Sequence, residues 1–421
     1  MTKKLVIKNI GPIKAVDFKI NKVNVFMGRQ SSGKSTIAKI LSFCNWVEKD
    51  ISIHQTFEKY VSEETYFVDK LETFHKLKGY LNSKSYIKYI GDAIDIELIN
   101  NKVLVKWLDS RFEYKRTKIS YIPSERSMVI LPEMEKLELP NNYLKSYLYD
   151  WLDTRKFYTS ENKFELLDIG ARYYFSLENK ESHISSDSYD ILLSQASSGV
   201  QSVTPLLTMV HNLIINIYEQ DNSSSYELDE IKAKVTQLII SEFVIKPYYN
   251  EDYVEEERKI KIKELNDKIA DKDETVLKLF QNYLTIRNNI FKTQRTNLII
   301  EEPEQNLFPS TQKKLCYRLL EYLKTDLDHS LTITTHSPYI LYALNNCILS
   351  KIVEDKIPEK LKNRASCIQS SIRPQEISVY EIKEGELVNI QQENGLIGNN
   401  FFDHQMKEVM DDFYLLLNFL D

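Results

Sequence analysis

The segment at residues 28–36 constrains the fold most, because it reads Gly-Arg-Gln-Ser-Ser-Gly-Lys-Ser-Thr and matches the pattern GxxxxGK[ST]. An apolar run, Val23 to Met27, precedes it, and apolar residues at helical spacing follow it. Residues 23–45 are therefore predicted to form a strand, a loop and a helix. This is the context that a phosphate-binding loop requires, so the sequence predicts a nucleotide site here.

The residue types in this loop explain how it would hold phosphate. Successive backbone N–H groups and the first helical turn point at an anion, and glycines permit a backbone geometry that a Cβ would obstruct. Lys34 would reach the β- and γ-phosphate oxygens, and the Ser35 hydroxyl would bind Mg²⁺. The expected ligands are ATP and Mg²⁺, and the expected nucleotide-binding residues are Gly28, Arg29, Gln30, Ser31, Ser32, Gly33, Lys34, Ser35 and Thr36.

The composition is that of a globular chain. Of its 421 residues, 42% are hydrophobic and 28% are charged, and the net charge of −6 argues against a protein that coats polyanions over its whole surface. No apolar run in the sequence approaches the ~18 residues that a membrane span needs. The 4 cysteines are scattered, which fits reduced thiols rather than a zinc site. We therefore expect a soluble, cytoplasmic protein without membrane contact.

A second motif, at residues 298–304, reads Leu-Ile-Ile-Glu-Glu-Pro-Glu. A buried parallel strand that ends in acids would deliver carboxylates to the phosphates. Neighbouring strand residues point to opposite sides, so Glu301 would hold Mg²⁺ while Glu302 would orient or deprotonate the attacking water. Taken alone, the same residues would also fit an ordinary strand that runs into an acidic turn.

A third motif, Thr-Thr-His-Ser-Pro at residues 334–338, ends another apolar strand. Ser337 as N-cap and Pro338 at the first helical position signal the start of a helix. His336 would then lie at the strand tip, within reach of a γ-phosphate, as a catalytic residue beside Glu302. A lone histidine is more often structural or simply exposed.

A fourth segment begins with Ser197, Ser198 and Gly199 and continues into apolar residues at helical spacing. A loop of small residues that leads into a helix N-terminus can bind an anion. By itself the segment is a weak signal, because Ser-Ser-Gly also occurs in ordinary helix caps. Its position between the phosphate loop and the acidic strand makes it a candidate site.

In this order the four motifs resemble the ABC-type ATPases of the RecF, structural-maintenance-of-chromosomes and OLD (overcoming lysogenization defect) group. The forms Glu-Glu-Pro-Glu, Leu-Phe-Pro and Thr-His-Ser-Pro most resemble the OLD-like AAA ATPases of bacterial anti-phage defence systems, of the PARIS, Septu or abortive-infection type, without a Toprim domain. The resemblance covers about residues 1–45, 119–215 and 295–350. It implies an α/β fold, an ABC/RecF-like P-loop NTPase head with an N-terminal antiparallel β portion, a mixed parallel sheet and helical inserts.

The resemblance also implies a homodimer or higher oligomer with ATP between the protomers. Ser197, Ser198 and Gly199 would match the signature loop that acts in trans, and His336 would match the switch histidine. Residues 121–126 resemble the family's YIPAER stretch, which would place Glu125 and Arg126 near the Q-loop position. An exposed salt bridge between these two residues is an equal alternative.

The leading interpretation is an ATPase that senses a trigger and controls a separately encoded effector in anti-phage defence. The short Ser-Ser-Gly signature, Glu301 in place of Asp and the long insert before it argue against a transporter subunit. A RecF-like DNA-repair or clamp ATPase is the first alternative. An OLD-like nuclease is the second, although no cluster of carboxylates for its metal ions is evident after His336.

The chain is expected to form a single ABC-type ATPase domain over 1–421. Within it, 46–118 would be a basic α/β insert, and 222–292 a helical insert between the signature loop and the acidic strand. The second insert would either dock an effector or brace the dimer. Residues 351–421 would complete the core with a hairpin and a helix.

The charge of the basic insert would allow it to bind nucleic acid. Residues 70–118 carry eleven Lys/Arg against six Asp/Glu, which is a local net charge of +5. These lysines could meet phosphates with help from Tyr86, Tyr89 and Trp107. The alternative is a lysine-rich solvated face.

Overall fold

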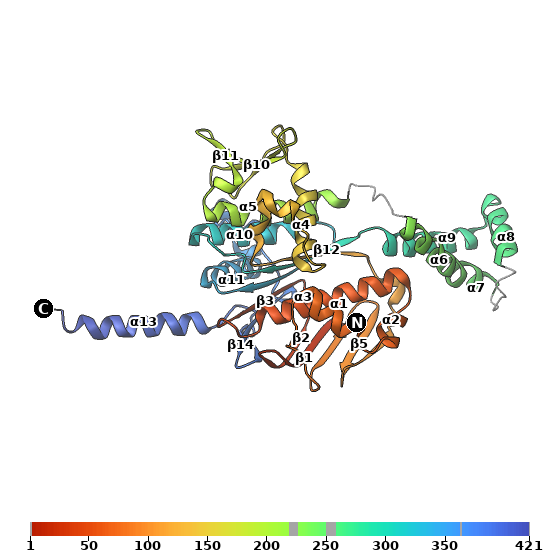
Figure 1. Cartoon of the computed structure of the whole chain (residues 1–421), viewed down its shortest axis with the longest axis horizontal. Helices are drawn as coiled ribbons and strands as arrows, with labels where there is room; N and C mark the ends of the chain where they lie inside the picture. Colours follow the sequence, from red (N-terminus) through yellow and green to blue (C-terminus); the bar gives the residue numbers. More distant parts are fainter. Residues whose placement is uncertain (1, 219–225, 250–257, 363, 421) are drawn as a thin grey trace.

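A computed structural model describes residues 2–218, 226–249, 258–362 and 364–420. Its framework is an 11-stranded sheet (Figure 1). In spatial order the strands are β6 (Lys102–Trp107), β5 (Ile94–Ile99), β4 (Tyr86–Ile90), β1 (Lys4–Ile10), β2 (Ile13–Lys19), β15 (Glu386–Asn389), β14 (Ile377–Lys383), β3 (Val23–Gly28), β13 (Ser330–Thr335), β12 (Arg295–Glu301) and β7 (Thr117–Ile122).

The sheet has an antiparallel part and a parallel part. β6, β5, β4, β1 and β2 pair antiparallel, whereas β14, β3, β13, β12 and β7 pair in parallel. The hairpin of β14 and β15 joins the two parts, because β14 pairs with β3 and β15 pairs with β2. The predicted α/β fold class, with an antiparallel N-terminal portion and a mixed parallel sheet, is confirmed. The carboxyl ends of β3, β12 and β13 share one edge of this sheet.

Helices cover both faces of the parallel part, which explains why its strands read as continuous apolar runs. Phe26 of β3 belongs to the core on one face, and Val25 and Met27 belong to the core on the other. This alternation follows from the two-residue period of a strand. The first face is covered by α1 (Lys34–His54), and the second by α5 (Ser198–Ile214), α10 (Pro309–Tyr322) and α11 (Pro338–Ile352).

The chain between β7 and α5 forms a smaller lobe. Helix α4 (Tyr143–Thr154) lies there, and its Trp151 ring packs 5.7 Å from the Tyr173 ring, centroid to centroid. Tyr173 belongs to a four-stranded antiparallel sheet of order β11-β10-β9-β8. Its strands are β8 (Phe164–Glu165), β9 (Arg172–Ser176), β10 (Glu181–Ser185) and β11 (Asp190–Leu192).

One helix in the described part of the chain, Ser198–Tyr218, is long and apolar enough to cross a membrane by length and composition. Within the structure, 67% of its apolar window is buried. Leu206, Met209 and Val210 have no exposed surface and belong to the core beneath the sheet. In this fold the helix therefore serves as a core helix.

The predicted helical insert is present as a short bundle at one end of the molecule (Figure 1). It has its own apolar core, in which Leu265 and Val276 are fully buried. Residues 222–225 and 250–257 of the insert lie outside the described residues. The helices are α6 (Tyr226–Ile240), a π-helical turn (Ser241–Ile245), α7 (Lys246–Tyr249), α8 (Arg258–Ala270) and α9 (Glu274–Phe291).

The basic insert is part of the main sheet. α1 continues to His54, beyond the predicted insert boundary at 46, and β4 pairs with β1, so that β4, β5 and β6 extend the antiparallel part. The hypothesis that Tyr89 stacks on nucleic acid is corrected. Its side chain is 1% exposed, and its hydroxyl donates to Glu48 Oε2 at 2.7 Å.

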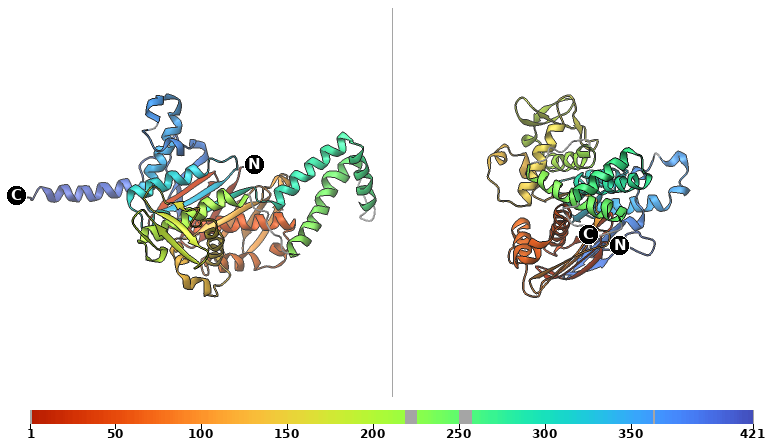
Figure 2. Two further views of the ribbon diagram at one scale, coloured as in Figure 1. Left: turned by 90° about the horizontal axis from the view of Figure 1, so that it is seen from above. Right: turned by 90° about the vertical axis from the view of Figure 1, so that its right-hand side faces the viewer.

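The C-terminal unit divides into two parts. Strand β14 lies in the centre of the sheet, as the prediction of a core hairpin requires. Helix α13 (Phe401–Leu417), however, extends away from the body at the end opposite the helical insert (Figure 2) and has no buried residue. The expectation that this helix completes the core is therefore corrected. It presents an apolar face to solvent instead, formed by Met406, Val409, Phe413, Leu416 and Leu417.

Removal of residues 405–421 is expected to leave the folded body intact, because this part of α13 buries no side chain. The melting temperature should stay within about 2 °C of that of the full chain. Leu344→Ala in α11 is the matched control, because Leu344 is fully buried. It should destabilise the protein by about 2–5 kcal/mol. A truncation that lowers the melting temperature as much as Leu344→Ala would show that α13 packs against the body in solution.

Candidate nucleotide site

The phosphate loop has the predicted strand–loop–helix context, with β3 before it and α1 after it. Gly28 and Gly33 have φ values of +150° and +108°, which L side chains rarely adopt. A Cβ at Gly28 would also lie 2.9 Å from the Ile382 carbonyl oxygen, and one at Gly33 would lie 2.9 Å from Ile13 Cγ1. Both glycines are therefore required by the backbone geometry and by close neighbours.

Lys34 lies inside this loop and is 5% exposed. Its Nζ donates to the carbonyl oxygens of Gly28, at 3.0 Å, and Arg29, at 2.8 Å. Burial lowers the pKa of Lys34 to about 8, while the charges of Glu302, Glu304 and Glu301 oppose that shift. The amine of the phosphate loop and the acids after β12 thus form one electrostatic cluster.

The two predicted acids at the end of β12 lie in different surroundings. Glu301 is 3% exposed, and its Oε1 is buried without a hydrogen-bond partner among the described residues. Glu302 is half-buried, has a φ of +43°, and donates its backbone N–H to the Thr334 carbonyl oxygen at 2.8 Å. A non-glycine residue in this conformation is uncommon and is often found at functional sites.

The structure brings Glu302 and His336 together, as predicted. His336 follows β13, the neighbour of β12, and its Nε2 lies 3.5 Å from Glu302 Oε1. This contact with His336 lowers the pKa of the Glu302 carboxyl below its ordinary value. Glu302 is therefore held as a carboxylate that can orient or deprotonate a water molecule.

Glu304 also belongs to this site, although its position in the sequence suggests no task for it. Its Oε1 accepts the His336 backbone N–H at 2.6 Å, and burial raises the pKa of its carboxyl. Glu304 thereby ties the loop after β12 to the loop after β13. Its place as the third acid of the Glu-Glu-Pro-Glu motif was the signal that could have identified Glu304 as a site residue. The sequence does not show that the partner of this acid is a backbone amide.

Arg126 does not form the exposed salt bridge that was one of its two interpretations. Its side chain has no exposed surface, and its guanidinium donates to the carbonyl oxygens of Glu301, at 2.9 Å, and Glu302, at 2.7 Å. It also donates to the Ser202 carbonyl oxygen of α5 at 3.3 Å. Arg126 therefore positions the acidic strand end, whereas Glu125 is exposed and accepts from the Tyr143 hydroxyl at 3.3 Å.

The candidate signature segment lies at the start of α5. Ser197 is the N-cap residue but makes no side-chain capping bond, and both Ser197 and Ser198 are exposed. Gly199 packs closely within its own chain, because a Cβ there would lie 2.8 Å from the Asn306 carbonyl oxygen. The segment thus touches the loop that follows Glu302 and leaves two hydroxyl groups open to a second molecule.

Ser35 and Glu301 are the residues that would hold Mg²⁺. In the described part of the chain, no group of three or more His, Cys, Asp or Glu residues could hold a metal ion. This fits Mg²⁺, which usually takes one or two protein ligands and completes its octahedron with water and substrate phosphates. The unpartnered Oε1 of Glu301 fits the same interpretation.

No family model and no curated protein matches the chain. Among solved structures, it is similar to the SMC head domain from Thermotoga maritima, with 10% identity, a TM-score of 0.37 and coverage of 93% of this chain and 99% of that chain. An SMC head bound to the C-winged helix domain of ScpA has 10% identity, a TM-score of 0.38 and coverage of 93% and 99%. The recombination mediator protein RecF with ATPrS has 12% identity, a TM-score of 0.32 and coverage of 93% and 98%. Because these identities and TM-scores are low, we base the proposed function on the geometry of the site.

Proposed function

We propose that the protein binds and hydrolyses ATP with Mg²⁺, as an ATPase of the ABC type. The observation that carries this proposal is the convergence of Lys34, Glu302 and His336 at the carboxyl ends of three neighbouring parallel strands. Ligands of open α/β sheets bind at this edge. Phosphate release from ATP, measured with Mg²⁺ and again with EDTA, tests the proposal. Release that persists in EDTA would contradict it.

Each residue has a distinct task in this reaction. The loop amides and Lys34 bind the β- and γ-phosphates, and Ser35 and Glu301 hold Mg²⁺, which neutralises phosphate charge when bound. Glu302 orients the attacking water and accepts its proton. His336 holds the Glu302 carboxylate through the 3.5 Å contact and reaches toward the γ-phosphate. Glu304 and Arg126 position these groups through the backbone bonds described above.

We further propose that two protomers share each ATP, with Ser197, Ser198 and Gly199 of one completing the site of the other. Exposure of the two serine side chains at the N-terminus of a 17-residue helix supports this arrangement. A protomer would then be inactive alone, and hydrolysis would depend on protein concentration.

Ser197→Arg is expected to preserve ATP binding and reduce hydrolysis at least tenfold, because a bulky side chain would block the approach of a second protomer's nucleotide. It is a cleaner test than a change at Gly199, which contacts Asn306 of its own chain. Ser83→Arg, at an exposed serine of the basic insert, is the matched control and should hydrolyse ATP normally. Equal specific activity of Ser197→Arg and the unaltered protein at all concentrations would rule out the shared site.

The biological role that we propose is control of a separately encoded effector in anti-phage defence, with a RecF-like clamp as the alternative. ATP turnover that rises with added DNA would favour the RecF-like alternative. Turnover that is indifferent to DNA would favour control through a protein partner.

A further inference from the structure

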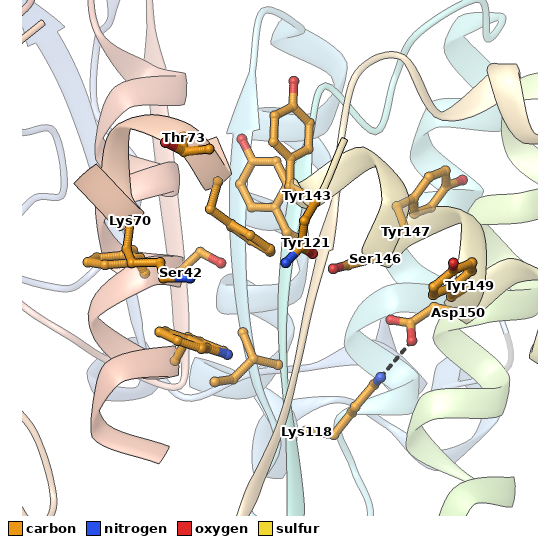
Figure 3. Close-up of a pocket in the computed structure, with 15 residues that line it drawn as sticks. Ser42, Lys70, Thr73, Lys118, Tyr121, Tyr143, Ser146, Tyr147, Tyr149 and Asp150 are labelled. Carbon is orange, nitrogen blue, oxygen red and sulfur yellow. Dashed lines mark hydrogen bonds and ion pairs between the residues drawn. The ribbon is translucent and has the colours of Figure 1, made fainter. Parts of the chain in front are cut away.

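We propose that a cavity outside the phosphate loop, between α1 and α3 (Tyr66–His75) on one side and β7 and α4 on the other, binds a nucleoside phosphate. The cavity has a volume of about 520 Å³ and is lined by side chains from all four elements (Figure 3). Ligand sites in proteins typically span roughly 300–1,000 Å³. The cavity is thus large enough for a base, a sugar and a phosphate group.

The walls of this cavity are aromatic. Phe43 and Trp46 of α1 stack on one side, with centroids 6.0 Å apart and planes inclined by 24°. Tyr147 and Tyr149 of α4 stand on the opposite side, and Tyr143 lies between the two sides next to Tyr121 (Figure 3). Trp46 is 37% exposed and Tyr149 is 55% exposed, so both rings are accessible from solvent. Every nucleobase has a π-face that stacks on such rings.

The charge around the cavity is positive. Lys70 and Lys118 line it, and the Nζ atoms of Lys39 and Lys76 lie 5.2 Å and 5.6 Å from the centroid of the Tyr143 ring. The acids nearby are Asp150, which pairs with Lys118 at 2.6 Å, Glu125, which accepts from the Tyr143 hydroxyl, and Glu301, whose charge acts on Tyr143. Four lysines against three acids favour a ligand that carries negative charge.

Polar side chains in the same cavity are free to recognise a base or a sugar. Thr73, Asn141 and Ser146 line it, and their side chains make no hydrogen bond within the described ranges of the chain. An amide supplies both a donor and an acceptor, and each hydroxyl supplies both as well. Aromatic walls, unpaired hydrogen-bonding groups and lysines together match a nucleoside phosphate better than a neutral apolar ligand.

The cavity is distinct from the phosphate loop but shares two elements with the ATP site. Ser42 lines the cavity and lies eight residues along α1 from Lys34, which is about 12 Å of helix. Tyr121 lines it from β7, where it pairs with Ile299, two residues before Glu301. A ligand in the cavity would therefore contact the helix that begins at the phosphate loop and the strand beside the catalytic acids.

The test is performed on Lys34→Ala protein, so that the phosphate loop does not contribute and the result does not depend on ATP hydrolysis. The probes are deoxyadenosine 5′-monophosphate, a short oligothymidylate and uncharged adenosine, titrated by calorimetry. We expect saturable binding of a charged probe, at least about fivefold tighter than that of adenosine. Trp46 fluorescence should be quenched on binding, because its ring lines the cavity.

Two substitutions test whether the charged probes bind in this cavity. Lys70→Glu and Tyr149→Ala, both at exposed side chains, should each weaken binding at least about tenfold. Lys102→Glu, an exposed lysine on the edge strand β6, makes the same charge change and should alter affinity less than about twofold. Circular dichroism confirms that each variant is folded.

The relative affinities of the probes show whether the ligand is a nucleic acid strand or a free nucleotide. Tighter binding of the oligothymidylate would identify the ligand as a nucleic acid strand. Tighter binding of the monophosphate would identify it as a free nucleotide. Both results would support a nucleoside phosphate as the ligand. The proposal is overturned if no charged probe binds at millimolar concentration, if adenosine binds as tightly as the charged probes, or if neither Lys70→Glu nor Tyr149→Ala weakens binding.

Discussion

Replacement of Lys34 with Ala is expected to weaken ATP binding by at least about 100-fold, which corresponds to roughly 2.7 kcal/mol. The amine is buried within the phosphate loop, and the only backbone groups that it contacts there are the carbonyl oxygens of Gly28 and Arg29. These oxygens repel phosphate, and removal of the amine leaves the exposed Arg29, which lies over the Phe401 ring, as the remaining cation of the loop to offset the triphosphate. Calorimetric titration with a non-hydrolysable ATP analogue measures the loss.

The control for this variant is Lys19→Ala, which removes the same charge at an exposed position on β2. It should bind the analogue with unchanged affinity. Lys19→Ala should melt within about 2 °C of the unaltered protein because its side chain is exposed. Lys34→Ala removes a buried side chain, so circular dichroism must show that this variant is folded. Lys34→Ala protein that binds the analogue normally would show that the segment at 28–36 is not the nucleotide site.

Replacement of Glu302 with Gln is expected to slow ATP turnover by about 100-fold or more while ATP binding is retained. The glutamine keeps the size of the side chain and can still contact His336, but it cannot accept the proton of the attacking water. Binding is retained because Lys34 and the loop amides, rather than Glu302, hold the phosphates. Phosphate release at saturating ATP measures the loss, and turnover equal to that of the unaltered protein would remove Glu302 from the mechanism.

Glu304→Gln is the matched control for this variant. Glu304 is two residues away and also faces the site, but its task is to accept the His336 backbone N–H. A glutamine carbonyl oxygen can accept the same bond, so turnover should fall by less than about tenfold. Equal losses in the two variants would mean that Glu302 acts by positioning His336, as Glu304 does, rather than as a base.

The phosphate loop and the two strand-end motifs were predictable because their signals are local. A strand, a glycine loop and a helix follow one another in residues 23–45, and the turn at Glu384 and Gly385 connects two adjacent strands. The pairing of Glu302 with His336 was also predictable, because strands that end in site residues share an edge in a parallel sheet. The sequence by itself thus determined the fold class and the candidate residues around the phosphates.

Only the tertiary structure decided the surroundings of these residues. Arg126 meets the Glu302 carbonyl oxygen across 176 positions of sequence, and no local pattern encodes a buried guanidinium that binds backbone. The same reason applies to α13, because its apolar spacing fits a core helix but the structure shows that the helix is exposed. It also applies to the cavity beside Trp46, because four separate elements enclose that cavity. Periodicity reports which face of an element is apolar, but what that face meets depends on contacts between segments far apart in the chain.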